Sequence, residues 1–131
     1  MGGPDSPQTA KGGKTMNVLI IINGPAYGSE LPFNGLRLAR ELAKRDDVRL
    51  RVFLMGDAVV AALAGQQLPD GYYHLDRMLT SCLRRDTEVG CCGTCMNARA
   101  IDDAQLVDGA RRSSMEELAT WTIEADRVVT F

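Results

Sequence analysis

The segment Met16–Asn23, with the sequence MNVLIIIN, constrains the fold more than any other part of the chain. It is a continuous aliphatic and β-branched run, without the alternation of apolar and polar residues that is typical of a strand with one solvent-exposed face. Such a run predicts a strand that is buried on both faces, as in a parallel sheet. Because parallel neighbours need crossover connections, the rest of the chain should supply helices between strands.

Strand-like and helix-like segments do alternate along the sequence. Further strands are predicted at Arg49–Met55, Thr87–Cys92, Leu106–Val107 and Arg127–Phe131. Helices are predicted at 34–45, with Asn34 as the N-cap, and at 58–64, 73–85 and 96–101. A last helix follows a capping box of Ser113 or Ser114 with Glu116 or Glu117, and should bury Met115, Leu118, Ala119 and Thr122. The pattern predicts a three-layer α/β fold of the flavodoxin-like kind, a mostly parallel five-stranded sheet with helices on both faces.

This fold also predicts where a site should lie. In open parallel sheets, ligands bind beyond the carboxyl ends of the strands, at the point where the strand order reverses. For a flavodoxin-like order that begins 2-1-3, that point lies between the first and third strands. The loops Gly24–Phe33 and Cys92–Arg99 would then meet, and the cysteines would lie in the site.

The size and charge of the chain exclude several classes of protein. At 131 residues it has room for one domain, predicted at 16–131, after a segment at 1–15 that is disordered or a remnant of expression engineering. The net charge of -2, with arginines interspersed among carboxylates, argues against nucleic-acid binding. The longest apolar run, Val18–Ile22, is too short to cross a membrane, and no signal peptide is recognisable. We therefore expect a cytoplasmic protein with reduced thiols and no membrane partner.

The cysteine cluster at the end of the third predicted strand is the main candidate for chemistry. Cys92 and Cys95 form a C-x-x-C motif that enters a predicted helical turn, where N–H groups and the helix dipole should favour the thiolate of Cys92. Arg99 could add to this field, and Cys95 could attack a persulfide or mixed disulfide on Cys92, or form a disulfide with it. Cys91 and Cys82 are interpreted as core residues.

Three kinds of chemistry could use this motif, besides a purely structural turn. A thioredoxin-like oxidoreductase does not fit, because no proline follows Pro69 to take the place of the downstream cis-proline. A zinc site does not fit well, because there is one C-x-x-C and a single histidine, His74. Sulfur transfer through a persulfide needs only one accessible, activated cysteine, and the sequence around Cys92 is consistent with such a cysteine. No metal or other cofactor is therefore expected.

Two other loops contribute candidate supporting residues. Tyr27, Ser29 and Glu30 lie in a Gly-rich loop that has no P-loop lysine and no dinucleotide-binding spacing, and they could line a pocket over Cys92 or form an ordinary turn. Asp57, after the second strand, could contact a ligand or cap a helix.

Several segments together resemble the DsrE/DsrF-like (YchN-type) family. They are Tyr27–Glu30 with Asn34–Ala39, Met55–Val59, Val89–Arg99 and Leu106–Arg112, and they span nearly all of 16–131. Members of this family are associated with sulfur relay and intracellular sulfur oxidation. The resemblance implies a sulfur acceptor at Cys92, supported by Arg99, in a homo-oligomer that is a trimer or hexamer, with sulfur-relay proteins as partners. Cys95 departs from the pattern of the relay proteins, and a disulfide with it would block persulfide formation.

The sequence therefore favours a sulfurtransferase that carries sulfane sulfur on Cys92, with Cys95 as a resolving or protective thiol. The alternative is a non-enzymatic oligomeric module whose Cys92-x-x-Cys95 binds a metal or senses redox state.

Overall fold

The computed structural model describes residues 15–131. The predicted disordered segment at 1–15 thus lies, apart from Thr15, outside the described residues. The strands are β1 (Met16–Ile22), β2 (Val48–Leu54), β3 (Glu88–Cys92), β4 (Ala110–Ser113) and β5 (Arg127–Thr130). The helices are α2 (Leu31–Ala43), α3 (Leu75–Leu83), α4 (Gly93–Ala98) and α5 (Met115–Glu124), with 3-10 turns η1 (Gly56–Ala62) and η2 (Asp103–Gln105).

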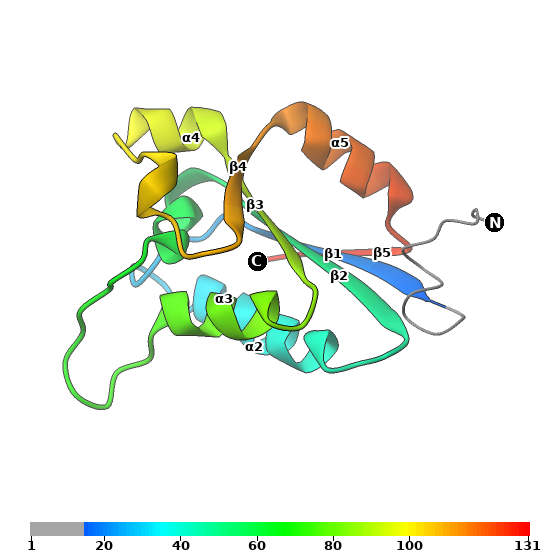
Figure 1. The fold of residues 1–131 in the computed structure, drawn as a ribbon, viewed down its shortest axis with the longest axis horizontal. Helices are drawn as coiled ribbons and strands as arrows, with labels where there is room; N and C mark the ends of the chain where they lie inside the picture. Colours follow the sequence, from blue (N-terminus) through cyan, green and yellow to red (C-terminus); the bar gives the residue numbers. More distant parts are fainter. Residues whose placement is uncertain (1–14) are drawn as a thin grey trace.

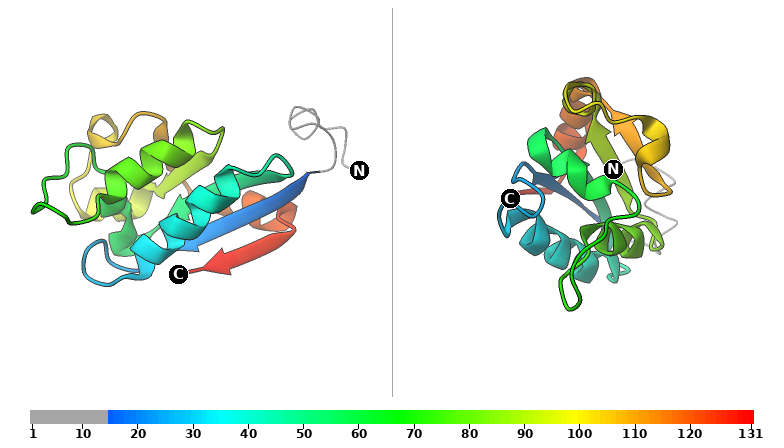
Figure 2. Two further views of the ribbon diagram at one scale, coloured as in Figure 1. Left: turned by 90° about the horizontal axis from the view of Figure 1, so that it is seen from below. Right: turned by 90° about the vertical axis from the view of Figure 1, so that its left-hand side faces the viewer.

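The five strands form one parallel sheet in the order β4-β3-β2-β1-β5. Helices α2 and α3 cover one face of this sheet, and α5 covers the other (Figures 1 and 2). The predicted three-layer α/β fold is therefore confirmed. The core consists of the aliphatic side chains of β1 and β2 and the helix residues packed on them, and Ile20, Val52, Phe53, Leu36 and Leu79 are completely buried.

The expected strand order 2-1-3 is wrong. Strand β3 pairs with β2, and the second neighbour of β1 is β5. The burial of β1 on both faces requires two neighbours but does not identify them, because β2, β3 and β5 all carry apolar side chains. This order changes which residues form the site, because the segment beside the cysteines is then the one that follows β2.

Two local expectations also need correction. Helix α2 begins at Leu31, and not at Asn34, because Pro32 is tolerated in a first turn where its missing N–H has no partner to lose. The fourth strand is Ala110–Ser113; Leu106 makes only an isolated bridge to Leu63, and its apolar side chain packs in the core. The apolar pair Leu106–Val107 indicates burial, whereas the edge strand that follows is polar and gives no apolar signal.

Of the four residues expected to be buried in the last helix, only Leu118 is buried. Ser114 is its N-cap and accepts a hydrogen bond from the N–H of Glu117, as predicted. Leu118 and Trp121 are its buried residues, whereas Met115, Ala119 and Thr122 are exposed. Within residues 15–131, no helix combines the length and apolar character that crossing a bilayer would require.

Candidate functional site

The site lies where β2 and β3 end at the same edge of the sheet. Leu54 at the end of β2 is paired with Cys91 of β3, so the residues that follow each strand emerge side by side. After β2 come Gly56 and Asp57, which begin η1, and after β3 comes α4, which begins at Gly93. This neighbour relationship brings together Cys92, Cys95, Asp57 and Arg99 from two loops that the sequence places about 40 residues apart.

The two adjacent cysteines of β3 face opposite layers. A Cβ atom on Gly90 would lie 3.3 Å from the ring of Trp121, so this position faces α5. Because side chains alternate along a strand, Cys92 shares that face and Cys91 faces the layer of α2 and α3. Cys91 is completely buried, and burial raises the pKa of its thiol to about 12. Cys82, in α3, is also completely buried, with a pKa raised by burial to about 11.

Cys92 is the N-cap residue of α4 and lies at the base of the site. The backbone N–H groups of Thr94 and Cys95 at the start of α4 lower the pKa of its thiol, although the side chain forms no capping hydrogen bond with them. Burial is the larger effect, however, because Cys92 is only 6% exposed, and interaction with the Cys95 thiol adds to it. The pKa of Cys92 is therefore raised above the ordinary 9.0, which is opposite to the predicted direction. A helix of six residues has too few aligned peptides to outweigh this desolvation.

Cys95 is the more exposed partner of the pair. Its sulfur accepts a hydrogen bond of 3.1 Å from the N–H of Gly56, which directly links the segments that follow β2 and β3. Gly56 has a φ of +59°, in the left-handed region, and a glycine allows this conformation without a steric cost. All four cysteines are free thiols.

Asp57 and Arg99 form an ion pair at the rim of the site. The Arg99 guanidinium donates to the Asp57 carboxylate at 2.6 and 2.9 Å, and a third N–H donates to the carbonyl oxygen of Cys95 at 2.9 Å. Asp57 does not cap a helix, since the N-cap of η1 is Met55. Arg99 therefore fixes the α4 turn against the β2 loop, and Asp57 offsets the positive charge that was expected to act on the thiol.

Arg112 is a residue of the site that the sequence did not indicate. From β4 it donates to the carbonyl of Gly93 (3.2 Å), to Asn97 (2.9 Å) and to Asp103 (2.7 Å). A Cβ atom on Gly93 would lie 3.1 Å from the carbonyl oxygen of Ser113 and 3.2 Å from Arg112, which explains the glycine inside the C-x-x-C. No local pattern could reveal this role, because it depends on β4 lying beside β3.

The loop residues Tyr27, Ser29 and Glu30 have structural contacts of their own. The Tyr27 hydroxyl hydrogen-bonds to Gln66 and accepts from the N–H of Leu75 at 2.9 Å, so it ties the loop after β1 to the segment before α3. Ser29 accepts from the N–H of Leu31 at 3.1 Å, and the carbonyl of Glu30 accepts from Asn34 in the first turn of α2. These three residues therefore stabilise the start of α2 and the packing of the loop that follows β1.

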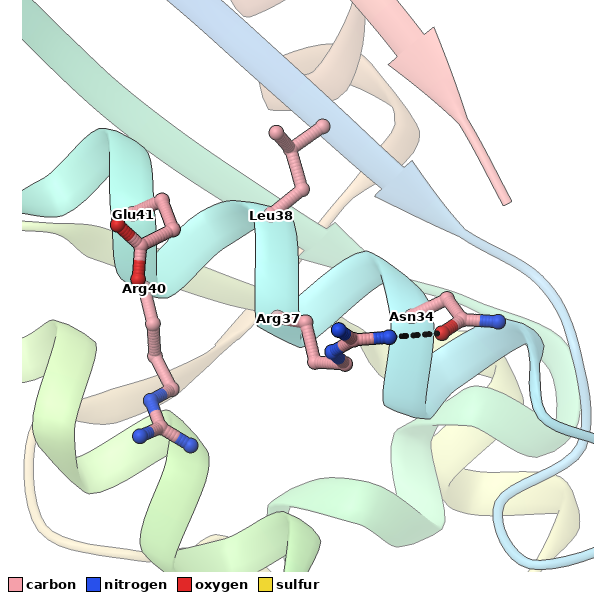
Figure 3. A pocket seen from close by; sticks show the side chains of 5 residues that line it. All are labelled: Asn34, Arg37, Leu38, Arg40 and Glu41. Atoms are coloured by element: carbon pink, nitrogen blue, oxygen red, sulfur yellow. Dashed lines mark hydrogen bonds between the residues drawn. The ribbon is translucent and has the colours of Figure 1, made fainter.

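A separate depression lies on the surface of α2 (Figure 3), which covers the opposite face of the sheet from α5 (Figure 1). It is lined by Asn34, Arg37, Leu38, Arg40 and Glu41 and has a volume of about 410 Å³. Arg37 donates to the Asn34 side chain at 3.2 Å, so the residue predicted as an N-cap instead braces a surface arginine. Among the described residues, no group of three or more His, Cys, Asp or Glu side chains is placed to hold a metal ion.

Comparisons with known proteins agree with this architecture. Residues 16–131 match the model of the DsrE/DsrF-like family. The chain is 43% identical over 115 residues to Protein YchN of Escherichia coli K12, covering 87% of this chain and 97% of the relative. It is 30% identical to an uncharacterized protein of Methanopyrus kandleri, MK0008, covering 87% of this chain and 93% of the relative.

Solved structures give the same result. The crystal structure of the E. coli YchN protein has a TM-score of 0.84 at 42% identity, covering 89% of this chain and all of that chain. The structure of MTH1491, a protein of unknown function from Methanobacterium thermoautotrophicum, has a TM-score of 0.70 at 14% identity, covering 88% and 99%. At this low identity the second likeness concerns the fold alone.

Proposed function

Because this chain belongs to the DsrE/DsrF-like family, a family associated with sulfur relay, we propose that it accepts sulfane sulfur as a persulfide on Cys92 and passes it on. The observation that carries this proposal is the position of Cys92 at the end of β3 and at the N-cap of α4, with the free thiol of Cys95 in the same helical turn. The backbone N–H groups of Thr94 and Cys95 favour a negative charge on the Cys92 sulfur.

The reaction transfers one sulfur atom without net oxidation. The Cys92 thiolate attacks the terminal sulfur of a persulfide donor, the S–S bond of the donor breaks, and the donor leaves as a thiol that takes up the proton of Cys92. A persulfide ionises more readily than a thiol, so the N–H groups of Thr94 and Cys95 would favour the product even though burial disfavours the thiolate that forms it. An acceptor thiol, on a sulfur-relay partner or a small molecule, then attacks the terminal sulfur. A reducing compartment such as the cytoplasm suits this cycle, because it keeps both thiols reduced.

The test uses the Cys95→Ala variant, in which no neighbouring thiol can attack the product. After anaerobic treatment with glutathione persulfide and removal of the donor, intact mass spectrometry should show a gain of about 32 Da, mapped to Cys92. The double variant with Cys92→Ser should show no gain, and Cys91→Ala in the same background should keep it. A Cys95→Ala protein that stays unmodified would overturn the proposal.

The competing function is a module whose cysteine pair binds a metal or senses redox state. The free thiols of Cys92 and Cys95, close to each other, would suit either role. Metal analysis of protein purified without chelators distinguishes a metal-binding module from a sulfur-transfer protein. Stoichiometric zinc that is lost in Cys95→Ala would favour the metal-binding module over sulfur transfer.

A further inference from the structure

We propose that the pair also reduces the bound sulfur: Cys95 attacks a persulfide on Cys92, releases hydrosulfide and leaves a Cys92–Cys95 disulfide. This inference rests on the proposed function, because it starts from a persulfide on Cys92. It adds an activity, the conversion of sulfane sulfur to sulfide, to the transfer of sulfur between thiols.

The first observation is the position of the two thiols at the start of α4. Cys92 is the N-cap residue of this helix and Cys95 is its third residue, so both side chains belong to one helical turn. A C-x-x-C spacing in such a turn is the arrangement in which protein dithiols form a disulfide.

The second observation is that the turn is held from two sides. Arg99 donates to the carbonyl of Cys95 and pairs with Asp57 of the β2 loop, while Arg112 donates to the carbonyl of Gly93. These contacts fix the backbone at both ends of the Gly93–Cys95 segment. The attacking sulfur is thus positioned in advance, which lowers the entropic cost of the intramolecular step.

The third observation is the environment of Cys95 itself. The N–H of Gly56 donates a hydrogen bond to its sulfur at 3.1 Å, which holds this side chain in a defined position. Cys91 and Cys82 cannot take this role, because both are completely buried and burial raises their pKa to about 12 and about 11. Cys95 is therefore the one thiol of the chain that is placed to resolve a persulfide on Cys92.

The step balances in atoms and electrons. The Cys95 sulfur forms a bond to the inner sulfur of the Cys92 persulfide, and the bond from that sulfur to the terminal sulfur breaks. The bonding electron pair leaves with the terminal sulfur, which takes the proton of Cys95 and departs as hydrosulfide. The sulfane sulfur gains two electrons, and the two cysteine thiols lose two when the disulfide forms. A dithiol reductant must restore the pair before another turnover.

A single-turnover experiment with the full chain tests this step. Reduced wild-type protein and the Cys95→Ala variant are treated anaerobically with one equivalent of glutathione persulfide. Hydrosulfide is trapped with monobromobimane, and intact mass is followed in time. The wild-type protein should release about one hydrosulfide per chain and lose about 2 Da, whereas Cys95→Ala should retain the added sulfur at least about tenfold longer.

The outcomes separate this inference from the proposed function. If Cys95→Ala gains sulfur and the wild-type protein holds it equally long as a persulfide, sulfide release is wrong and sulfur transfer stands. If neither protein gains sulfur and no hydrosulfide forms, the proposed function fails. A wild-type disulfide that forms without matching hydrosulfide also overturns the inference, because the oxidation then has another cause. Cys91→Ala serves as the matched control and should behave like the wild-type protein.

Discussion

At the scale of single residues, the chemistry depends on a competition at the Cys92 sulfur. Two backbone N–H groups favour the thiolate, but burial and the adjacent Cys95 thiol favour the protonated form, and the latter effects win. The Cys92 thiol is therefore mostly protonated at neutral pH. Its reactivity must rise with pH through and beyond 9, because the raised pKa moves thiolate formation upward.

Removing the Cys95 side chain should lower the pKa of Cys92. The Cys95→Ala change removes both the thiol–thiol hydrogen bond and the like charge, which each raise that pKa, and leaves the backbone N–H groups in place. The pH midpoint of Cys92 alkylation by iodoacetamide, followed by peptide mass spectrometry, should shift to lower pH. Thr94→Ala, which keeps its backbone N–H, should leave the midpoint unchanged. An alkylation midpoint that is unchanged or higher in Cys95→Ala would contradict the effect of the Cys95 side chain on the pKa of Cys92.

At the scale of elements, α5 depends on very few side chains for its position. Leu118 and Trp121 are its buried residues. The Trp121 ring meets Phe53 of β2 edge-on, with centroids 6.2 Å apart, and the guanidinium groups of Arg51 and Arg111 lie over it at 5.1 and 5.7 Å. Arg51 also pairs with Glu124 at the end of the helix, at 2.6 Å. One aromatic side chain therefore joins the helix, the sheet and its charged neighbours.

The Trp121→Ala variant should lose about 3 to 5 kcal/mol in free energy of unfolding, because a large buried ring and its partners are lost together. Thr120→Ala, one position away on the exposed side of the helix, should change stability by less than about 0.5 kcal/mol. Urea unfolding followed by circular dichroism at low protein concentration measures both. Equal losses in the two variants would mean that α5 is held by its own helicity and not by packing.

At the scale of the whole molecule, the outer side of α5 and the neighbouring edge strand carry apolar side chains in solvent. Ile123 is 85% exposed, Met115 55% and Val128 44%. The edge strand β5 lies beside β1 and is close to the end of α5 (Figure 2). Large exposed apolar side chains on a helix and on the edge strand next to it are typical of an interaction surface. We propose that the protein self-associates through these residues, in the homo-oligomer that the family resemblance leads us to expect.

We therefore expect the Ile123→Glu variant to dissociate a wild-type trimer or hexamer toward monomers, because a charge buried at an interface lacks a partner. Sedimentation velocity or light scattering after size-exclusion chromatography measures the mass. Arg37→Glu on α2, on the opposite face of the sheet, serves as a control for the effect of a surface charge. A wild-type protein that is monomeric at all concentrations would refute this prediction.

The sequence by itself determined the layers of this protein and the element that bears its candidate chemistry. Uninterrupted apolar runs such as Met16–Asn23 can be buried only between two layers, and helices that alternate with strands provide those layers, so the α/β fold follows from local pattern. The burial of Cys91 beside a C-x-x-C motif follows from the same periodicity.

Only the tertiary structure decided which strands are neighbours, and with them the composition of the site. Strand pairing depends on contacts between distant segments, and a local pattern carries no information about them. Four contacts at or near the site could therefore not be predicted from the sequence. They join Gly56 to Cys95, Asp57 to Arg99, Arg112 to Gly93, and Tyr27 to Leu75. The sequence also could not predict that the pKa of Cys92 is raised, because desolvation depends on how the folded chain packs and not on the motif.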